Sequence, residues 1–136
     1  MSLAALVTWI LTAAGGFVLL GTWLARGGTR RPRTSRFPPA LVFGHFGVAA
    51  AGLVVWIIAL LTTSRTSVWV ALVLVLLAAV LGFGLLARWI PVRRSANGEP
   101  PEKHFAVPVV VAHGVFAVAT VVLVLLTALG VAAGGA

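Results

Sequence analysis

The sequence of 136 residues contains no cysteine, and only two of its residues are acidic. Without a thiol the chain can form neither a disulfide nor an iron–sulfur centre. Charged residues make up 9% of the chain and hydrophobic residues 61%, against about 25% and about 45–50% in soluble domains. This composition excludes an ordinary soluble globule, a disordered chain and a disulfide scaffold, and it leaves the class of integral membrane proteins.

Long apolar segments account for most of the chain. They lie at residues 3–25, 38–63, 67–90 and 105–131. Each is long enough to cross a bilayer, and each must be helical because only a helix satisfies its own backbone polar groups in lipid. The first lacks a basic N-terminal region and is longer than the apolar part of a signal peptide, so we expect it to be a membrane helix. The sequence therefore predicts one all-α transmembrane domain over residues 1–136, built as an up-and-down bundle of four helices.

Basic residues gather in two of the three connections between these segments. Nine of the ten lie in them or at their edges, as Arg26, Arg30, Arg31, Arg33 and Arg36 in the first and Arg88, Arg93, Arg94 and Lys103 in the third. By the positive-inside rule, we expect both connections in the cytoplasm and both termini outside. Trp23 and Trp89 lie at the corresponding segment ends, which is the usual interfacial place of aromatic residues.

The surroundings of the protein follow from the same counts. Basic loops beside a membrane are typical of contacts with anionic lipid head groups, and we expect no nucleic acid as a partner. Nine of the ten basic residues are arginine, and alanine, valine, leucine and glycine are used heavily. This usage indicates a GC-rich bacterial gene, so the predicted location is the bacterial inner membrane.

The second and fourth segments resemble each other. Phe37 and Phe105 are 105 − 37 = 68 residues apart, and His45 and His113 are 113 − 45 = 68 apart. Gly16 and Gly82, in the first and third segments, are 82 − 16 = 66 apart. The spacing predicts a two-helix unit used twice, over about residues 1–63 and 67–131, in which both copies point the same way.

His45 and His113 are the only ionisable side chains at membrane depth. Such residues are costly and mark candidate functional sites. Each lies two turns past the basic end of its segment, and both segments point the same way, so the two imidazoles are expected at one height. In an up-and-down bundle the second and fourth helices are diagonal. Two imidazoles facing each other across the bundle are what the iron of a six-coordinate haem b requires.

The surroundings of the histidines fit a flat macrocycle. Small residues occur at this level on all four segments, as Gly16, Gly44, Gly47, Gly82 and Gly114. Arg33, Arg36 and Lys103 are available to pair with haem propionates, and His104 could serve there too. The predicted cofactor site therefore holds one haem b near the cytoplasmic side.

This pattern resembles the small four-helix membrane cytochromes of b type, namely the bacterial cytochrome b561 group and the haem-carrying anchor subunits of quinone-linked dehydrogenases. The resemblance rests on the architecture, on His45 and His113, and on the glycines near them. It implies an electron-transfer protein or subunit rather than a stand-alone enzyme. A quinone, a larger respiratory complex or a second copy of the chain would be its partners. The two-haem members need four membrane histidines, so only one haem is implied here.

Other readings of the two histidines stay open. They could make interhelical hydrogen bonds, worth about 1 kcal/mol each, or handle protons in a cofactor-free structural or accessory subunit. Two histidines without a third ligand argue against zinc and non-haem iron. A small multidrug transporter would need a carboxylate in the first helix, and segment 3–25 has none.

Overall fold

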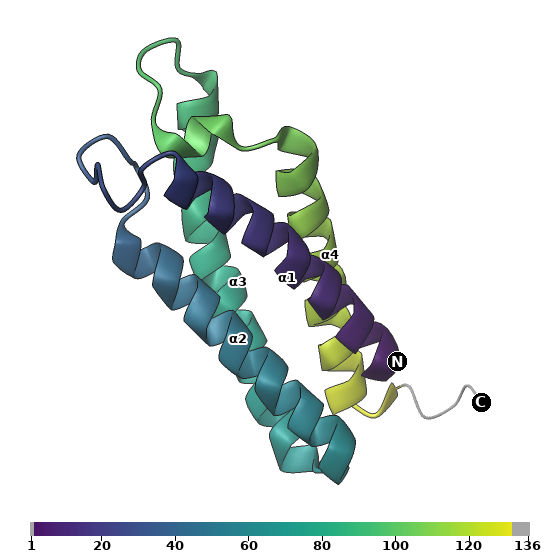
Figure 1. Ribbon diagram of the computed structural model, residues 1–136. Helices are drawn as coiled ribbons and strands as arrows, with labels where there is room; N and C mark the ends of the chain where they lie inside the picture. Colours follow the sequence, from purple (N-terminus) through teal and green to yellow (C-terminus); the bar gives the residue numbers. More distant parts are fainter. Residues whose placement is uncertain (1, 132–136) are drawn as a thin grey trace.

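A computed structural model describes residues 2–131. Within this range the chain is helical and contains no strand (Figure 1). Its elements are α1 (Ser2–Ala25), α2 (Pro39–Thr62), α3 (Arg65–Arg94), the short 3-10 helix η1 (Pro101–His104) and α4 (Val107–Ala128). All four long helices are long and apolar enough to cross a membrane. The expectation of an all-helical membrane protein with four spans is therefore confirmed.

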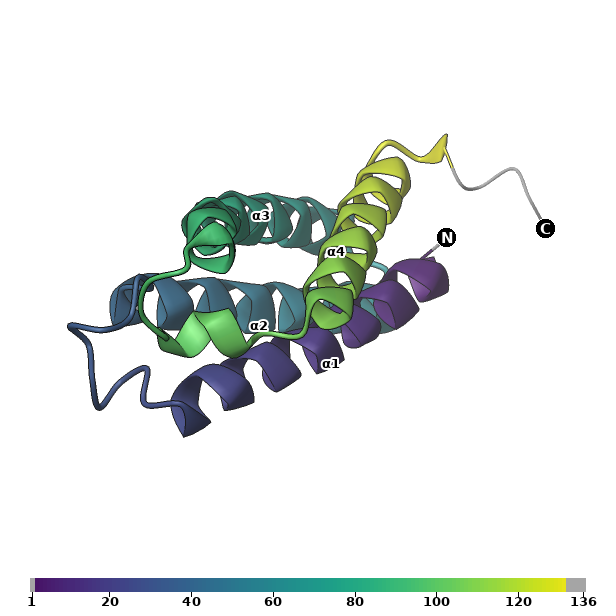
Figure 2. The ribbon, with the colours of Figure 1, turned by 90° about the horizontal axis from the view of Figure 1, so that it is seen from above.

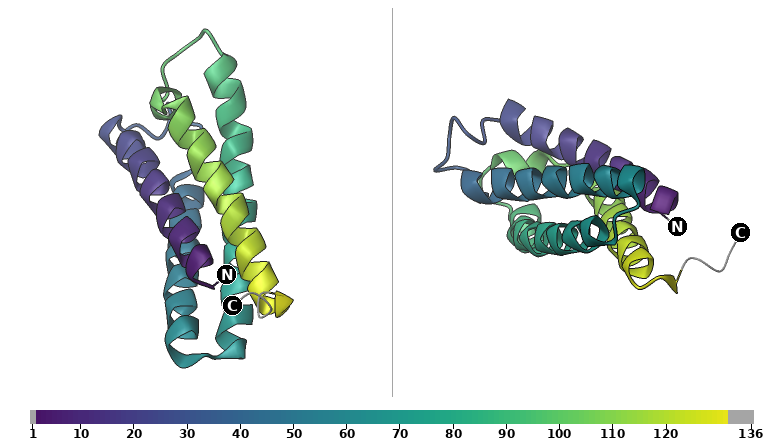
Figure 3. Two further views of the ribbon diagram at one scale, coloured as in Figure 1. Left: turned by 90° about the vertical axis from the view of Figure 1, so that its right-hand side faces the viewer. Right: turned by 90° about the horizontal axis from the view of Figure 1, so that it is seen from below.

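The helices run alternately up and down (Figure 1). The most extensive packing joins α2 to α3 and α1 to α4, and contacts of α1 with α2 and of α3 with α4 close the ring. The views from above and from the side show the same arrangement (Figures 2 and 3). Because the backbone of α2 comes close to those of α1 and α3 but not to that of α4, the second and fourth helices are diagonal.

The two ends of the bundle differ in composition. One end, which we call the loop end, holds the connections 26–38 and 95–106. The other, which we call the terminal end, holds the start of α1, the end of α4 and the tight turn between α2 and α3 (Figure 1). All basic residues except Arg65 lie at the loop end. The charge is therefore distributed unevenly along the bundle axis, because nearly all the basic residues lie at one end.

Local chemistry sets the helix boundaries. At the end of α1, Gly27 takes a φ of 89°, and the Gly28 N–H donates to the Trp23 carbonyl at 2.9 Å, which is the pattern of a glycine-terminated helix. A β-carbon on Gly28 would lie 2.2 Å from the Trp23 ring, so this position must be glycine. At the other end of the bundle, the Ser64 hydroxyl accepts from the Ser67 N–H at 3.2 Å and caps α3.

Two helices, α3 and α4, differ most from their predicted ranges. α3 begins at Arg65 and continues through Pro91 to Arg94, beyond the expected 67–90. Pro91 is exposed and close to the end of the helix, so its missing N–H removes one hydrogen bond from a face that water can reach. α4 occupies Val107–Ala128 within the expected 105–131, because a proline stands in its first turn and Gly130 has a φ of 74°.

Two separate apolar clusters hold the bundle together. The cluster in the terminal half contains Trp9 and Trp56, whose ring centroids are 6.5 Å apart. The cluster at the loop end contains Trp23, Trp89 and Phe37. On every helix the residues between the two clusters are those at the level of His45 and His113. The histidines thus lie between two packed layers.

A network of hydrogen bonds at the loop end joins the first and third connections. The Glu102 carboxylate is fully buried, and it accepts from the Ser35 hydroxyl at 3.0 Å and from the Arg36 backbone N–H. The Trp23 indole donates to the Ser35 oxygen at 3.0 Å, and the Trp89 indole donates to the Glu102 carbonyl at 3.1 Å. We call Trp23, Ser35, Arg36, Trp89 and Glu102 the loop clasp. It fixes the interfacial ends of α1 and α3 to both polar connections.

Candidate functional site

His45 and His113 face each other inside the bundle. Their ring centroids are 6.2 Å apart, and the planes of the rings are inclined by 75°. His45 lies 45 − 39 = 6 residues after the start of α2, and His113 lies 113 − 107 = 6 residues after the start of α4. At about 1.5 Å per residue, each is about 9 Å into its helix. The structure therefore brings the two predicted residues together, at one depth and from diagonal helices.

Each imidazole is held by a backbone carbonyl of a neighbouring helix. His45 Nδ1 lies 2.8 Å from the Ala78 oxygen in α3, and His113 Nδ1 lies 2.8 Å from the Thr12 oxygen in α1. A carbonyl only accepts hydrogen bonds, so Nδ1 must carry the proton in both rings. In a neutral imidazole this leaves Nε2 with a free lone pair, which is the form that ligates a metal.

Three glycines let the histidines lie against the neighbouring backbones, and a β-carbon on the first, Gly15, would be 3.3 Å from His113 Cβ. A β-carbon on Gly82 would be 3.1 Å from His45 Cε1, and one on Gly16 would be 3.2 Å from His113 Cε1. Ordinary contacts of this kind are 3.4–4 Å. Each ring therefore lies along one turn of the neighbouring helix. The His45 ring extends from the Ala78 carbonyl to Gly82 in α3, and the His113 ring extends from the Thr12 carbonyl to Gly16 in α1. Any side chain at these glycines would press on the ring.

The other predicted glycines are placed differently. A β-carbon on Gly44, Gly47 or Gly114 would meet no atom within 4 Å. They adjoin the histidines in sequence, but successive helical residues point about 100° apart. They therefore leave open space beside α2 and α4, and no ring of the chain lies against them.

The predicted cations all lie at the loop end. Arg33 and Arg36 are exposed in the first connection, and only the backbone N–H of Arg36 takes part in the loop clasp. Lys103 is in η1, where its ammonium donates to the Gly98 carbonyl at 3.1 Å. His104 is the last residue of η1 and is half-buried. The structure groups these residues on the side of the bundle where the histidine-bearing helices begin.

The donor set limits which metal centres are feasible. Among residues 2–131 no group of three or more histidine, cysteine, aspartate or glutamate side chains is placed to hold a metal ion. A protein-only zinc or non-haem iron site needs three or four such ligands. The histidine pair alone falls short of that number.

Sequence reasoning did not find the carbonyl partners or the buried carboxylate. Backbone oxygens carry no residue signature, but Thr12–Gly16 and Ala78–Gly82 share a spacing of four residues. They also share the 66-residue offset of the two glycines, since 78 − 12 = 66 and 82 − 16 = 66. Glu102 lies in a polar connection, where an acidic residue gives no sign of burial.

The comparisons with known proteins leave the site to be judged by its geometry. The sequence matches no protein-family model, no curated protein and no solved structure.

Proposed function

We propose that this chain is a b-type cytochrome of the bacterial inner membrane, in which His45 and His113 ligate one haem between α2 and α4. It would exchange single electrons, as an electron-transfer protein or as a subunit of a larger respiratory complex, with a quinone as the expected partner. The observation that carries the proposal is the histidine pair itself. Two imidazoles face each other across the bundle, and each has its Nδ1 proton committed to a carbonyl.

The spacing of the rings suits one metal between them. A ligating imidazole nitrogen lies about 2 Å from its metal, and the ring centre about 1 Å further, so two rings on opposite sides of one metal have centres about 6 Å apart. The observed separation is 6.2 Å.

A bound haem would supply a reversible one-electron couple, and the chain's own residues would tune and hold it. The hydrogen bonds from Nδ1 to Ala78 and Thr12 fix the orientation of both rings and make Nε2 a stronger donor. Gly16 and Gly82 set how close each ring lies to the adjacent helix. The apolar clusters pack on either side of the level of the histidines.

The charged end supports an orientation for the whole protein. We place the loop end in the cytoplasm and both termini outside, because nine of the ten basic residues lie at the loop end. Trp23 and Trp89 lie there at the ends of the apolar segments, in agreement with an interface. In this orientation Arg33, Arg36 and Lys103 supply positive charge for the haem carboxylates on the cytoplasmic side.

The contacts also support the proposed internal repeat of α1–α2 and α3–α4. Adding 68 to His45 gives His113, and subtracting 66 from Ala78 and Gly82 gives Thr12 and Gly16. The two offsets therefore relate the contact of His45 with α3 to the contact of His113 with α1. The same offsets relate Trp23 to Trp89 (89 − 23 = 66) and Phe37 to Phe105 (105 − 37 = 68), and all four rings pack in one layer.

A second candidate function rests on the same hydrogen bonds. Each histidine joins its own helix to a neighbour, α2 to α3 and α4 to α1. Such bonds would hold the helices together in a cofactor-free structural or accessory subunit.

Absorbance of the protein expressed with adequate haem supply and purified in detergent separates the two functions. A cytochrome shows a Soret band and, after dithionite, sharp α and β bands. His45→Ala and His113→Ala should each remove the low-spin six-coordinate spectrum, whereas His104→Ala, a histidine outside the helical core, should keep it. A colourless, fully helical preparation would reject the haem, and a wild-type spectrum in either core variant would reject that ligand.

A further inference from the structure

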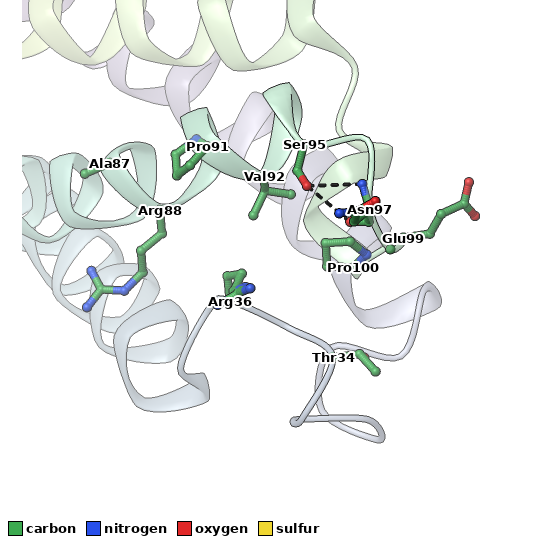
Figure 4. Close-up of a pocket in the computed structure, with 11 residues that line it drawn as sticks. Thr34, Arg36, Ala87, Arg88, Pro91, Val92, Ser95, Asn97, Glu99 and Pro100 are labelled. Atoms are coloured by element: carbon green, nitrogen blue, oxygen red, sulfur yellow. Dashed lines mark hydrogen bonds between the residues drawn. The ribbon is translucent and has the colours of Figure 1, made fainter.

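A cavity of about 790 Å³ opens on the surface at the loop end (Figure 4). It lies between the last turns of α3, the first connection and the segment that leads to η1. Its polar lining includes Arg36, Arg88, Ser95 and Asn97, and its apolar wall includes Pro91 and Val92. None of these side chains belongs to the histidine pair, so the cavity is a separate feature of the molecule.

The arginines in this cavity have unused hydrogen-bonding capacity. Arg88 is exposed, and its Nη1 donates to the Gly84 carbonyl at 2.9 Å. A guanidinium has five N–H donors, so most of those on Arg88 remain for a ligand. Arg36 contributes its backbone N–H to Glu102, while its side chain is exposed. Both guanidinium groups therefore keep donors for an anion at the cavity.

The acidic residues of the chain do not neutralise this site. The Glu102 carboxylate is buried and accepts from Ser35 and from the Arg36 N–H. Glu99 lines the cavity, but in Figure 4 its carboxylate points away from Arg36 and Arg88. With Arg93 and Arg94 at the end of the same helix, the cavity has a strongly positive surround.

The position of the cavity relates it to the membrane surface. Arg88 is the first charged residue after the apolar part of α3, and it precedes Trp89, a member of the loop clasp. Its bond to Gly84 turns the guanidinium back towards the apolar part of the helix. Pro91 and Val92 continue the wall beside it. A ligand here would have its charge on the arginines and an apolar portion beside the membrane-facing side of α3.

We propose that this cavity binds a phosphate group, and that its source is the head group of an anionic phospholipid. Arginine pairs with phosphate through two parallel charge-assisted hydrogen bonds, and the Asn97 side chain adds a neutral polar partner. Basic pockets beside transmembrane helices are where anionic lipids are recognised. The cavity shares Arg36 with the proposed haem-carboxylate contacts, whereas Arg88 has no part in them, so Arg88→Gln tests the lipid site apart from the proposed cofactor site.

Lipid titration of the detergent-purified full chain, followed by native mass spectrometry, tests the proposal. The probes are phosphatidylglycerol, zwitterionic phosphatidylcholine and inorganic phosphate. Phosphatidylglycerol should bind at least tenfold more tightly than phosphatidylcholine. The double variant Arg36→Gln/Arg88→Gln should lose this preference, and the control Arg30→Gln/Arg94→Gln, with the same change of net charge outside the cavity lining, should keep it. The absorbance of any bound haem should not change in Arg88→Gln.

The outcomes distinguish the two sources of phosphate. If inorganic phosphate at millimolar concentration displaces the lipid from the wild type but not from the double variant, the site is one for free phosphate and the lipid assignment is wrong. No preference for phosphatidylglycerol in the wild type, or an unchanged preference in the double variant, overturns the site altogether. Should the double variant misfold, Arg88→Gln alone, which leaves the loop clasp untouched, carries the same test with a smaller expected loss of about threefold or more.

Discussion

The contact between Gly82 and His45 makes a sharp prediction about the histidine pair. Gly82→Ala would place a methyl group 3.1 Å from His45 Cε1, where contacts of 3.4–4 Å are ordinary. The ring would have to move by at least 3.4 − 3.1 = 0.3 Å. The ring cannot move freely, because its Nδ1 is hydrogen-bonded to the carbonyl of Ala78, which lies one turn before Gly82 in α3. Overpacking of this kind costs about 1–3 kcal/mol.

The control for this prediction is Gly44→Ala. A methyl group there would meet nothing within 4 Å, yet the variant gains the same helix propensity of about 1 kcal/mol. We therefore expect Gly82→Ala to unfold more readily than Gly44→Ala, in denaturant titrations in detergent followed by circular dichroism. In the haem-loaded protein we also expect a shifted Soret band for Gly82→Ala.

A double-mutant cycle shows whether the ring is responsible. If His45 causes the strain, the penalty of Gly82→Ala should disappear in a His45→Ala background, since the truncated side chain no longer reaches residue 82. Equal stability of Gly82→Ala and Gly44→Ala, or a penalty that persists without the imidazole, would show that the close approach of ring and backbone is not a constraint on this site.

Two further predictions concern the loop end. Glu102→Gln should lower the free energy of unfolding by about 1–3 kcal/mol, because an amide nitrogen would face one of the donors now served by the buried carboxylate. Glu99→Gln, at an exposed position, should change it little, and equal melting temperatures for the two variants would contradict the loop clasp. A cysteine introduced by Ser95→Cys should react with a membrane-impermeant maleimide only after the inner membrane is opened, since position 95 is exposed at the loop end. Labelling in intact cells would reverse the proposed orientation.

The sequence predicted those features that depend on composition and on spacing along one helix. Four spans followed from four apolar segments. The equal depth of His45 and His113 followed from their equal distance from the basic ends of parallel segments. Helix geometry relates such positions directly to height in the membrane, so no knowledge of packing was needed.

Features that depend on which helix faces are in contact were not predicted. Gly16 and Gly82 were expected at the level of the histidines, but the carbonyl partners of the rings and the contact of Gly15 with His113 were not. The buried carboxylate of Glu102 accepts a hydrogen bond from Ser35, which is 102 − 35 = 67 residues away in the sequence. Pairings of this kind arise only when the helices have assembled, and a single sequence does not contain them.

The main helix interfaces each join one half of the chain to the other. The most extensive contacts join α2 to α3 and α1 to α4, so each main interface takes one helix from either side of the turn at Thr63 and Ser64. Each histidine likewise obtains its carbonyl partner from the opposite half. A two-helix fragment ending at this turn would have neither a packing partner for its main faces nor a fixed imidazole. The folding of each half is thus conditional on the other, and two separately made halves would function only as a complementing pair.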